Sequence, residues 1–345
     1  MLSDSTLSIL KQSVPLWLKE LDIPGASLVL IDQTSIVWAQ GFGVKRSASL
    51  ESIDSNTIFE AGSLSKPLFA YCALQLIKQR SIHLDEPLIT YYPKRYTAWN
   101  FQPNEDKLPF VTMRHILAHS AGFSNWDCWE EPYIGRLKFF PGKKFAYSGE
   151  GYIFLQRVLE YNFAQTFWAC LEEVFTDCLG LANSNYTWKE EYNKYIATGC
   201  GNRNEGLDEY FLEPYSAFSL YSSPCDFAKF IIEMMQITDM DSLDSQNSLL
   251  AEMLVPQVKV NCFCSWGLGW GIEHTIKGDY FWHWGDMGNS QCFALASSAQ
   301  RHGIVIMTNS ENGLSLCERI IQYIFEIEHP CSKKAFLTKL GNHEF

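Results

Sequence analysis

A serine and a lysine three residues apart are the pair of side chains in this sequence best suited to chemistry. Ser63 and Lys66 lie in the run from Phe59 to Phe69. If the segment is helical, positions i and i+3 share one face, so the lysine amine can reach the hydroxyl. A serine hydroxyl is a weak nucleophile until a neighbour takes its proton, and a lysine in a dry site can do this once its pKa has fallen. The pair therefore predicts a nucleophilic serine with a lysine base.

The same spacing occurs a second time, at Ser8 and Lys11. Ser8 lies inside an amphipathic segment without other reactive residue types nearby. Ser63 follows Ala61 and Gly62, which suit a tight turn into a helix, and a helix N-terminus offers free backbone N–H groups that can hold an oxyanion. Ser63, rather than Ser8, is therefore the candidate nucleophile.

Two downstream segments carry further reactive residues. The first is Pro141-Gly142-Lys143-Lys144-Phe145-Ala146-Tyr147-Ser148-Gly149, and the second is Phe281-Trp282-His283-Trp284-Gly285-Asp286. The order serine–lysine, tyrosine, histidine-x-glycine resembles the serine β-lactamase-like superfamily, closest to its class C β-lactamase, D,D-peptidase and esterase branch. The likeness runs from about Pro24 to Ile324. It includes the stretches Leu84–Pro87, Thr112–Phe123, Ser219–Phe230, Trp266–Gly271 and Val305–Ser310.

The resemblance implies a role for each residue of these motifs. Ser63 would attack a carbonyl, while Lys66 and Tyr147 would move protons. A phenol with a pKa of about 10 is a poor base, so the Lys66 ammonium would have to favour its ionised form. The backbone N–H groups of Ser63 and Asp286, the residue after Gly285, would hold the oxyanion, and His283 would border the groove. The resemblance implies neither a metal nor an organic cofactor.

Two positions depart from the family pattern. Gly149 replaces an asparagine that stands two residues after the tyrosine, and Trp284 replaces a small residue, often threonine. Both changes should weaken recognition of β-lactams while leaving the acylation machinery in place. We therefore expect a serine hydrolase acting on a small ester or amide. The alternatives are a true class C-type β-lactamase or D-amino-acid peptidase, and a catalytically idle relative whose groove binds a ligand or a protein partner.

Composition limits the class of protein and of partner. The chain has 345 residues, of which 47% are hydrophobic and 14% aromatic, enough for a large core. Its formal net charge is -12 and it has no run of basic residues, which argues against a nucleic-acid partner. The expected partner is a small ester, amide or β-lactam substrate, and the sequence leaves a protein partner undetermined.

Cysteine usage and the N-terminus bear on the cellular compartment. The 11 cysteines are an odd number, which suits a reducing compartment. The first residues lack a basic segment followed by a long apolar one, and there is no uncharged apolar stretch of about 18 residues. We therefore expect a cytoplasmic protein without a membrane span, and export by a signal-free route stays compatible with the sequence.

Other patterns have simpler explanations than a second site. The glycines of Gly267–Gly271 lack the strand–turn–helix setting of a nucleotide loop. His115 and His119 are four residues apart but have no third metal ligand, and Cys262 and Cys264 read as buried or half-buried free thiols. The segment Trp126–Glu131 fits a lid or plain surface packing equally well, so we leave it out of the site.

Hydrophobic periodicity predicts an α/β fold in a single domain over residues 1–345. A helix over residues 5–21, bent or broken at Pro15, precedes two strands joined by a hairpin, and helices dominate from Ser63 to about Met240. The strands expected are Ala26–Ile31, Ser35–Gln40, Val258–Cys264, Trp266–Glu273, Tyr280–His283, Cys292–Ser297 and Gly303–Thr308, with a closing helix over Leu314–Ile327. One antiparallel sheet built from both termini would form a lobe of residues 1–62 and 255–345, flanked by helices. Residues 63–254 would form a mainly helical lobe.

Overall fold

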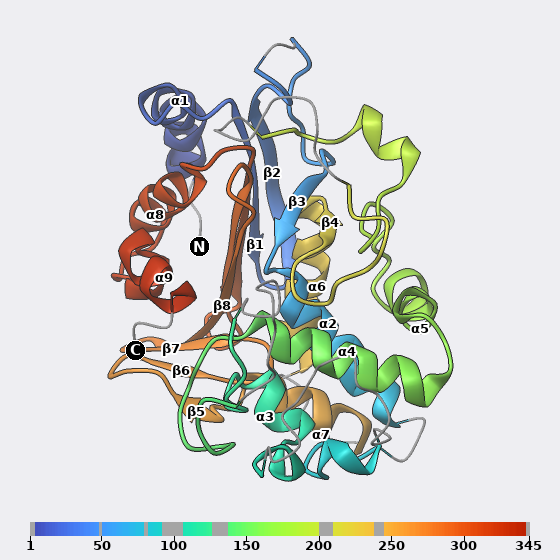
Figure 1. The fold of residues 1–345 in the computed structure, drawn as a ribbon. Helices are drawn as coiled ribbons and strands as arrows, with labels where there is room; N and C mark the ends of the chain where they lie inside the picture. The colour runs from blue at the N-terminus through green and yellow to red at the C-terminus, as the bar shows by residue number, and fades with distance from the viewer. Residues whose placement is uncertain are drawn as a thin grey trace.

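An eight-stranded antiparallel sheet forms the centre of the protein (Figure 1). The computed structural model describes residues 4–47, 50–78, 82–91, 106–125, 137–199, 210–237 and 245–342. The strands follow the order β2-β1-β10-β9-β8-β7-β6-β5. Their bounds are β1 Gly25–Asp32, β2 Ser35–Gly43, β5 Val258–Lys259, β6 Cys264–Trp266, β7 Gly271–Thr275, β8 Gly278–Asp286, β9 Gln291–Ser297 and β10 His302–Thr308.

The two ends of the chain meet in this sheet. Strand β1 pairs antiparallel with β10, with Ala26 opposite Thr308 and Asp32 opposite His302. Strand β9 is buried along its whole length, because both faces of the sheet are covered by helices. The expected α/β fold with one antiparallel sheet built from both termini is confirmed.

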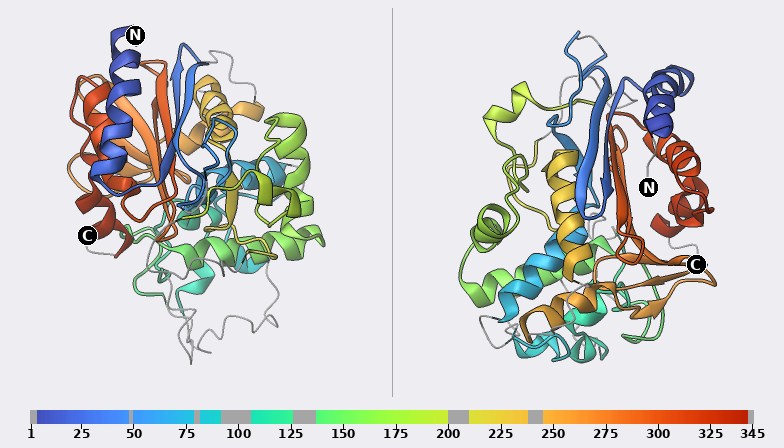
Figure 2. Two further views of the ribbon diagram at one scale, coloured as in Figure 1. Left: turned by 90° about the horizontal axis from the view of Figure 1, so that it is seen from above. Right: turned by 180° about the vertical axis from the view of Figure 1, so that it is seen from behind.

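Helices cover the sheet on both sides (Figure 2). One face is covered by α1 (Asp4–Glu20), α8 (Gly313–Ile324) and α9 (Lys334–Gly341), whose apolar side chains share a core with alternate residues of β1, β8 and β10. The other face is covered by α2 (Ser65–Lys78) and α6 (Pro224–Ile237). Among the described residues, no helix is long and apolar enough to cross a membrane.

The regular structure described between β2 and β5 is helical apart from a small second sheet. Besides α2 and α6, the described residues form α3 Met113–Leu117, α4 Gly149–Phe163, α5 Phe167–Glu173 and α7 Ser245–Ala251, with short 3₁₀ helices at Leu88–Thr90, Leu108–Phe110, Glu190–Lys194 and Glu252–Leu254 and a π-helical turn at Val174–Cys178. The second sheet pairs β3 (Phe59–Gly62) with β4 (Leu220–Ser222). The sequence pattern did not predict β3 or β4, because strands this short carry too little alternation to be detected.

Several expected boundaries were wrong for local reasons. Helix α1 is not broken at Pro15, which lies on its exposed side, where water can satisfy the carbonyl group that proline leaves free. The strand expected over Trp266–Glu273 is interrupted between β6 and β7, since Gly269 (φ +89°) passes so close to α2 that a Cβ there would lie 2.8 Å from the Ala70 Cβ. Helix α9 was not expected, and strand β5 is shorter than the predicted Val258–Cys264.

Candidate active site

Ser63 lies in the turn between β3 and α2. The helix begins at Ser65, so Ser63 precedes it and is not inside it as the spacing alone suggested. The Lys66 backbone N–H donates to the Ser63 carbonyl oxygen at 3.1 Å, and this turn brings the Lys66 Nζ to 2.9 Å from the Ser63 Oγ. The expected contact between the two side chains is therefore present, but a turn brings them together rather than one face of a helix.

Lys66 is buried completely, and its surroundings decide its charge. Its Nζ donates to the Ala217 carbonyl oxygen at 2.7 Å. Burial lowers the pKa of Lys66 well below the usual range of lysine, which favours the neutral amine. A neutral amine keeps one lone pair, so Lys66 can accept the Ser63 proton while still donating to Ala217.

Helix α4 holds the loop that carries Ala217. The Gln156 side chain, fully buried in α4, accepts from the Ser216 backbone N–H at 2.8 Å and donates to the Pro214 carbonyl oxygen at 2.9 Å. These two bonds fix the main chain on one side of Ala217. The position of the Lys66 amine thus depends on a residue 90 positions away, which sequence reasoning missed.

Two backbone N–H groups converge beside Ser63. A Cβ placed on Gly62 (φ +53°) would lie 2.9 Å from the Asp286 nitrogen, and one placed on Gly285 would lie 3.4 Å from the Ser63 nitrogen. The Met287 N–H donates to Ser290, so alternation along β8 turns the Asp286 N–H away from β9. Only glycine allows this approach, and two backbone N–H groups so close together are able to hold an oxyanion.

His119 forms hydrogen bonds with the two residues that flank Tyr147 in the sequence. Its carbonyl oxygen accepts from the Ala146 N–H at 2.7 Å, and its Nδ1 accepts from the Ser148 N–H at 3.0 Å. The rings of His119 and Tyr147 lie 4.4 Å apart. His119 has a φ of +54°, so the chain turns sharply there. The sequence gave no sign that this turn positions Tyr147.

The charge state of Tyr147 differs from the expectation. Tyr147 is buried, and burial raises its pKa far above the usual value, while the neighbouring Ser63 side chain acts in the opposite direction. The two hydroxyls do not meet hydrogen-bond geometry, and the Tyr147 hydroxyl forms no hydrogen bond with the described residues. The Lys66 Nζ lies 4.8 Å from the centre of the tyrosine ring. The expectation that the Lys66 ammonium ionises Tyr147 is wrong, because both groups are buried and both favour their neutral forms.

His283 and Trp284 are neighbours on β8, and their rings stack with the centroids 5.2 Å apart. His283 is buried, and its Nδ1 lies 2.7 Å from the Trp284 carbonyl oxygen. Burial and the nearby Lys66 lower the pKa of His283 to about 3, so the imidazole is neutral and its Nδ1 donates. Trp284 packs against the ring of Tyr147 with the centroids 4.8 Å apart. His283 lies on the same side of Tyr147 as Trp284, with its ring 6.1 Å from that of Tyr147, so the bulk of Trp284 supports Tyr147 together with His283.

Gly149 is the first residue of α4 and is already hydrogen-bonded through its backbone. Its N–H donates to the Asn125 Oδ1 at 2.8 Å, and the Asn125 Nδ2 donates to the Gly341 carbonyl oxygen at 3.2 Å. Asn125 thus ties the start of α4, two residues after Tyr147, to the end of α9. The segment Trp126–Glu131 lies outside the described residues.

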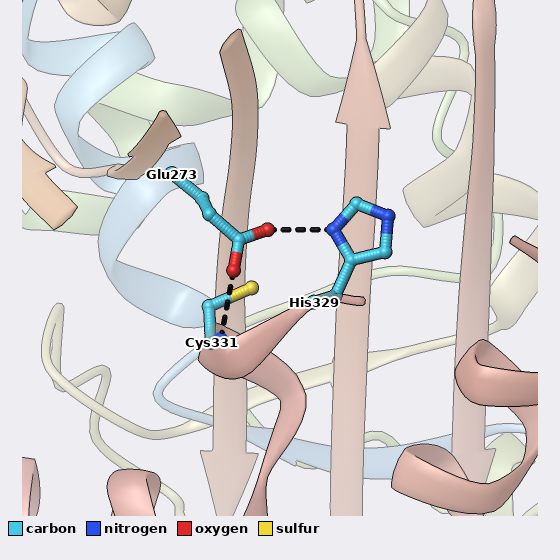
Figure 3. A group of neighbouring side chains, drawn as sticks. All are labelled: Glu273, His329 and Cys331. Carbon is cyan, nitrogen blue, oxygen red and sulfur yellow. Dashed lines mark hydrogen bonds and ion pairs between the residues drawn. The ribbon is translucent and has the colours of Figure 1, made fainter. Parts of the chain in front are cut away.

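One group of described residues has the composition of a metal site. Glu273, on β7, lies beside His329 and Cys331 (Figure 3); all three are buried, with donor atoms within 4.8 Å of one another. The Glu273 carboxylate accepts from the His329 Nδ1 at 2.6 Å and from the Cys331 N–H at 2.9 Å. Two ligands of one tetrahedral zinc ion, at bonds of about 2.0 Å, would lie about 3.3 Å apart. The group is a hydrogen-bonded link between β7 and the 3₁₀ helix Pro330–Ser332.

The other candidate ligands also have structural roles. His115 completes a capping box with Thr112 at the start of α3. Cys262 is exposed and Cys264 is buried, and both are free thiols, so only Cys262 departs from the expected burial.

Comparison with known proteins places the chain in a family. It is 21% identical over 314 residues to Protein flp of Staphylococcus aureus (strain MRSA252), covering 83% of this chain and 60% of that protein. The chain thus spans less than two thirds of the length of this relative. Esterase EstB of Burkholderia gladioli is 25% identical over 111 residues, which is 32% of this chain and 27% of the esterase.

A solved structure shares the fold. The β-lactamase/D-alanine carboxypeptidase of Pseudomonas syringae superposes with a TM-score of 0.76 at 16% identity, covering 94% of this chain and all of that one. The antiparallel sheet flanked by helices is therefore a β-lactamase/transpeptidase-like fold. The Beta-lactamase family model matches residues 17–327, and the chain belongs to the β-lactamase family.

Proposed function

We propose that this protein is a serine hydrolase that forms an acyl-enzyme on Ser63 with a small ester or amide substrate. The observation that carries the proposal is the 2.9 Å contact between the Ser63 hydroxyl and the Lys66 amine, with Lys66 fully buried. An activated serine needs a base within hydrogen-bond reach whose pKa lies near the working pH, and a lysine in a dry site meets both conditions.

The chemistry can be followed proton by proton. The neutral Lys66 amine takes the Ser63 proton as the Ser63 oxygen bonds to the substrate carbonyl carbon. The negative charge on the carbonyl oxygen is held by the Ser63 and Asp286 N–H groups. Tyr147 gives its phenol proton to the leaving group and regains one from the Lys66 ammonium. In deacylation water takes the place of the leaving group, and the proton transfers run in reverse.

The machinery favours catalysis over a binding role alone. An idle relative has no need of a buried lysine hydrogen-bonded to a serine beside two converging N–H groups, since a buried lysine is costly. The esterase among the relatives is consistent with ester chemistry, while the absence of a side chain at Gly149 removes one means of orienting an amide. We therefore place esters ahead of β-lactams as substrates.

Activated esters are expected to be cleaved well and penicillins or cephalosporins poorly. Gly149→Asn should then raise β-lactam turnover relative to ester turnover, because it supplies an amide beside Tyr147. One hydrogen bond of about 1–3 kcal/mol corresponds to about 5–150-fold in rate. The measurement is kcat/KM for 4-nitrophenyl acetate and for a chromogenic cephalosporin.

Gly149→Ala is the matched control, since it adds a Cβ without an amide. Gly149 does not have a positive φ, so neither variant strains the backbone. Efficient cephalosporin hydrolysis with weak ester cleavage by the unmodified protein would instead restore a β-lactamase as the first interpretation.

A further inference from the structure

The carbonyl group that holds Lys66 belongs to a loop rather than to a helix or a strand. The Ala217 carbonyl oxygen accepts from the Lys66 Nζ at 2.7 Å, and the Ser63 Oγ lies 2.9 Å from the same nitrogen. Ala217 lies in a turn, and the next strand, β4, begins only at Leu220. The direction in which the Lys66 amine points therefore depends on the groups that keep this turn in place.

Two buried side chains hold the turn, one from each end. On α2, the Ser65 Oγ accepts from the Leu220 N–H at 3.0 Å. On α4, the Gln156 amide accepts from the Ser216 N–H at 2.8 Å and donates to the Pro214 carbonyl oxygen at 2.9 Å. Ser216 is fully buried, so without the amide its N–H would have to find another partner away from water.

A third contact fixes which way the Gln156 amide is turned. Its Nε2 also donates to the Glu160 Oε1 at 3.1 Å. An ionised carboxylate can only accept, so the amide nitrogen must face Glu160 and the amide oxygen is left for the Ser216 N–H. Gln156 thus has a single orientation, in which both ends of its amide meet the main chain of the turn.

The same helix supports the second proton-transfer group of the proposed mechanism. Tyr147 lies two residues before α4 begins at Gly149, and Gln156 follows seven residues after Gly149. Positions seven apart are two turns apart on one face of a helix. Helix α4 therefore ends beside Tyr147 and, two turns on, holds the turn that orients Lys66, whose Nζ lies 4.8 Å from the centre of the Tyr147 ring.

We propose that Gln156 is a positioning residue for acylation, because it holds the Ala217 carbonyl that keeps the Lys66 amine in line with the serine and the tyrosine. The inference rests on the proposed hydrolase function and adds a residue that acts on the reacting groups only through another residue. A misplacement of about 1 Å can cost about 100-fold in rate, so loss of the amide should slow acylation by about 10- to 100-fold.

Gln156→Met tests the inference, since methionine keeps the length and approximate volume of the side chain and removes its hydrogen bonds. With 4-nitrophenyl acetate under single-turnover conditions, the loss should fall on the limiting acylation rate and not on the half-saturating ester concentration. Asn162→Leu is the matched control, because the Asn162 amide, at the other end of α4, also donates to a main-chain carbonyl, that of Tyr91, at 2.8 Å. Both variants should lower the thermal midpoint, but Asn162→Leu should leave the acylation rate unchanged.

A second measurement, in the Lys66→Ala background, separates positioning from packing. A residue that acts only through Lys66 has nothing left to position once the amine is gone, so Gln156→Met should cost less than about 3-fold there. Gln156→Ala leaves room for a water molecule beside the Ser216 N–H and takes the place of the methionine variant if that one does not fold. It should give the same pattern.

Lys66→Ala also distinguishes failure of this inference from failure of the proposed function. If the unmodified protein is not acylated, or if Lys66→Ala is acylated at the unmodified rate, the proposed mechanism is overturned and this inference with it. If Lys66→Ala is slow, three results overturn the inference alone. They are an unchanged rate in Gln156→Met, an equal loss of rate in Asn162→Leu, and a loss from Gln156→Met that is as large in Lys66→Ala as in the unmodified protein.

Discussion

Replacing Lys66 by alanine is expected to slow acylation of Ser63 by about 10²- to 10⁴-fold, the usual effect of removing a general base. The amine is the group that contacts the Ser63 Oγ, and Ala217 merely holds it in place. The measurement is the acylation rate with an activated ester under single-turnover conditions. Lys11→Ala is the matched control, since Lys11 has the same spacing from Ser8 but is exposed on α1, and it should leave the rate unchanged.

The pH dependence of acylation gives the same prediction a second test. Burial lowers the pKa of Lys66, so the amine is the base above that lowered value and becomes a protonated, inactive ammonium as the pH falls through it. The acidic limb of kcat/KM should therefore lie well below the ordinary lysine range and disappear in Lys66→Ala. A rate that rises only near pH 10 would show that Lys66 rests in its charged form.

Replacing Tyr147 by phenylalanine is expected to be about as harmful, by about 10²- to 10⁴-fold in turnover. The substitution keeps the ring that packs on His119 and Trp284 and removes only the hydroxyl. That hydroxyl is buried without a hydrogen bond to the described residues, so its loss should leave the thermal midpoint unchanged or slightly raised. Steady-state kinetics and thermal unfolding of the same sample separate the two effects. A large fall in stability with little loss of turnover would make Tyr147 a packing residue.

The two losses should not add in the double variant. In the proposed mechanism Lys66 and Tyr147 pass one proton between them, and residues that act as a unit show strong coupling in a kinetic cycle. The double variant is therefore expected to lose little more than either single one. Free energies that add would contradict a shared relay.

The sequence predicted the sheet and the reactive residues because both can be recognised from short stretches of sequence. Strands such as β1 and β10 have continuous apolar runs, and Ser63 and Lys66 are only three residues apart. The supports of the site could not be predicted, because they depend on contacts between distant segments. Ala217 meets Lys66 across 151 positions, and Gln156 holds the Ala217 loop from another helix.

The charge states were also beyond the sequence. Proximity to Lys66 alone would predict an ionised Tyr147, but burial lowers the pKa of Lys66 and raises that of Tyr147, which favours the neutral form of both. The stacking of Trp284 on both His283 and Tyr147 was also beyond the sequence, because strand alternation alone would separate the side chains of adjacent residues. The role of His119 depends on its contact with the backbone around Tyr147, 28 residues later, and no local sequence pattern predicts that contact.

Covalent labelling of the intact protein with a fluorophosphonate, followed by peptide mapping, tests the central claim most directly. A single adduct is expected on the peptide that contains Ser63, because this serine alone among the described ones touches a buried lysine beside two converging N–H groups. Ser63→Ala should abolish the adduct, and Ser8→Ala should leave it unchanged. An adduct that survives Ser63→Ala, or that maps to another serine, would contradict the account.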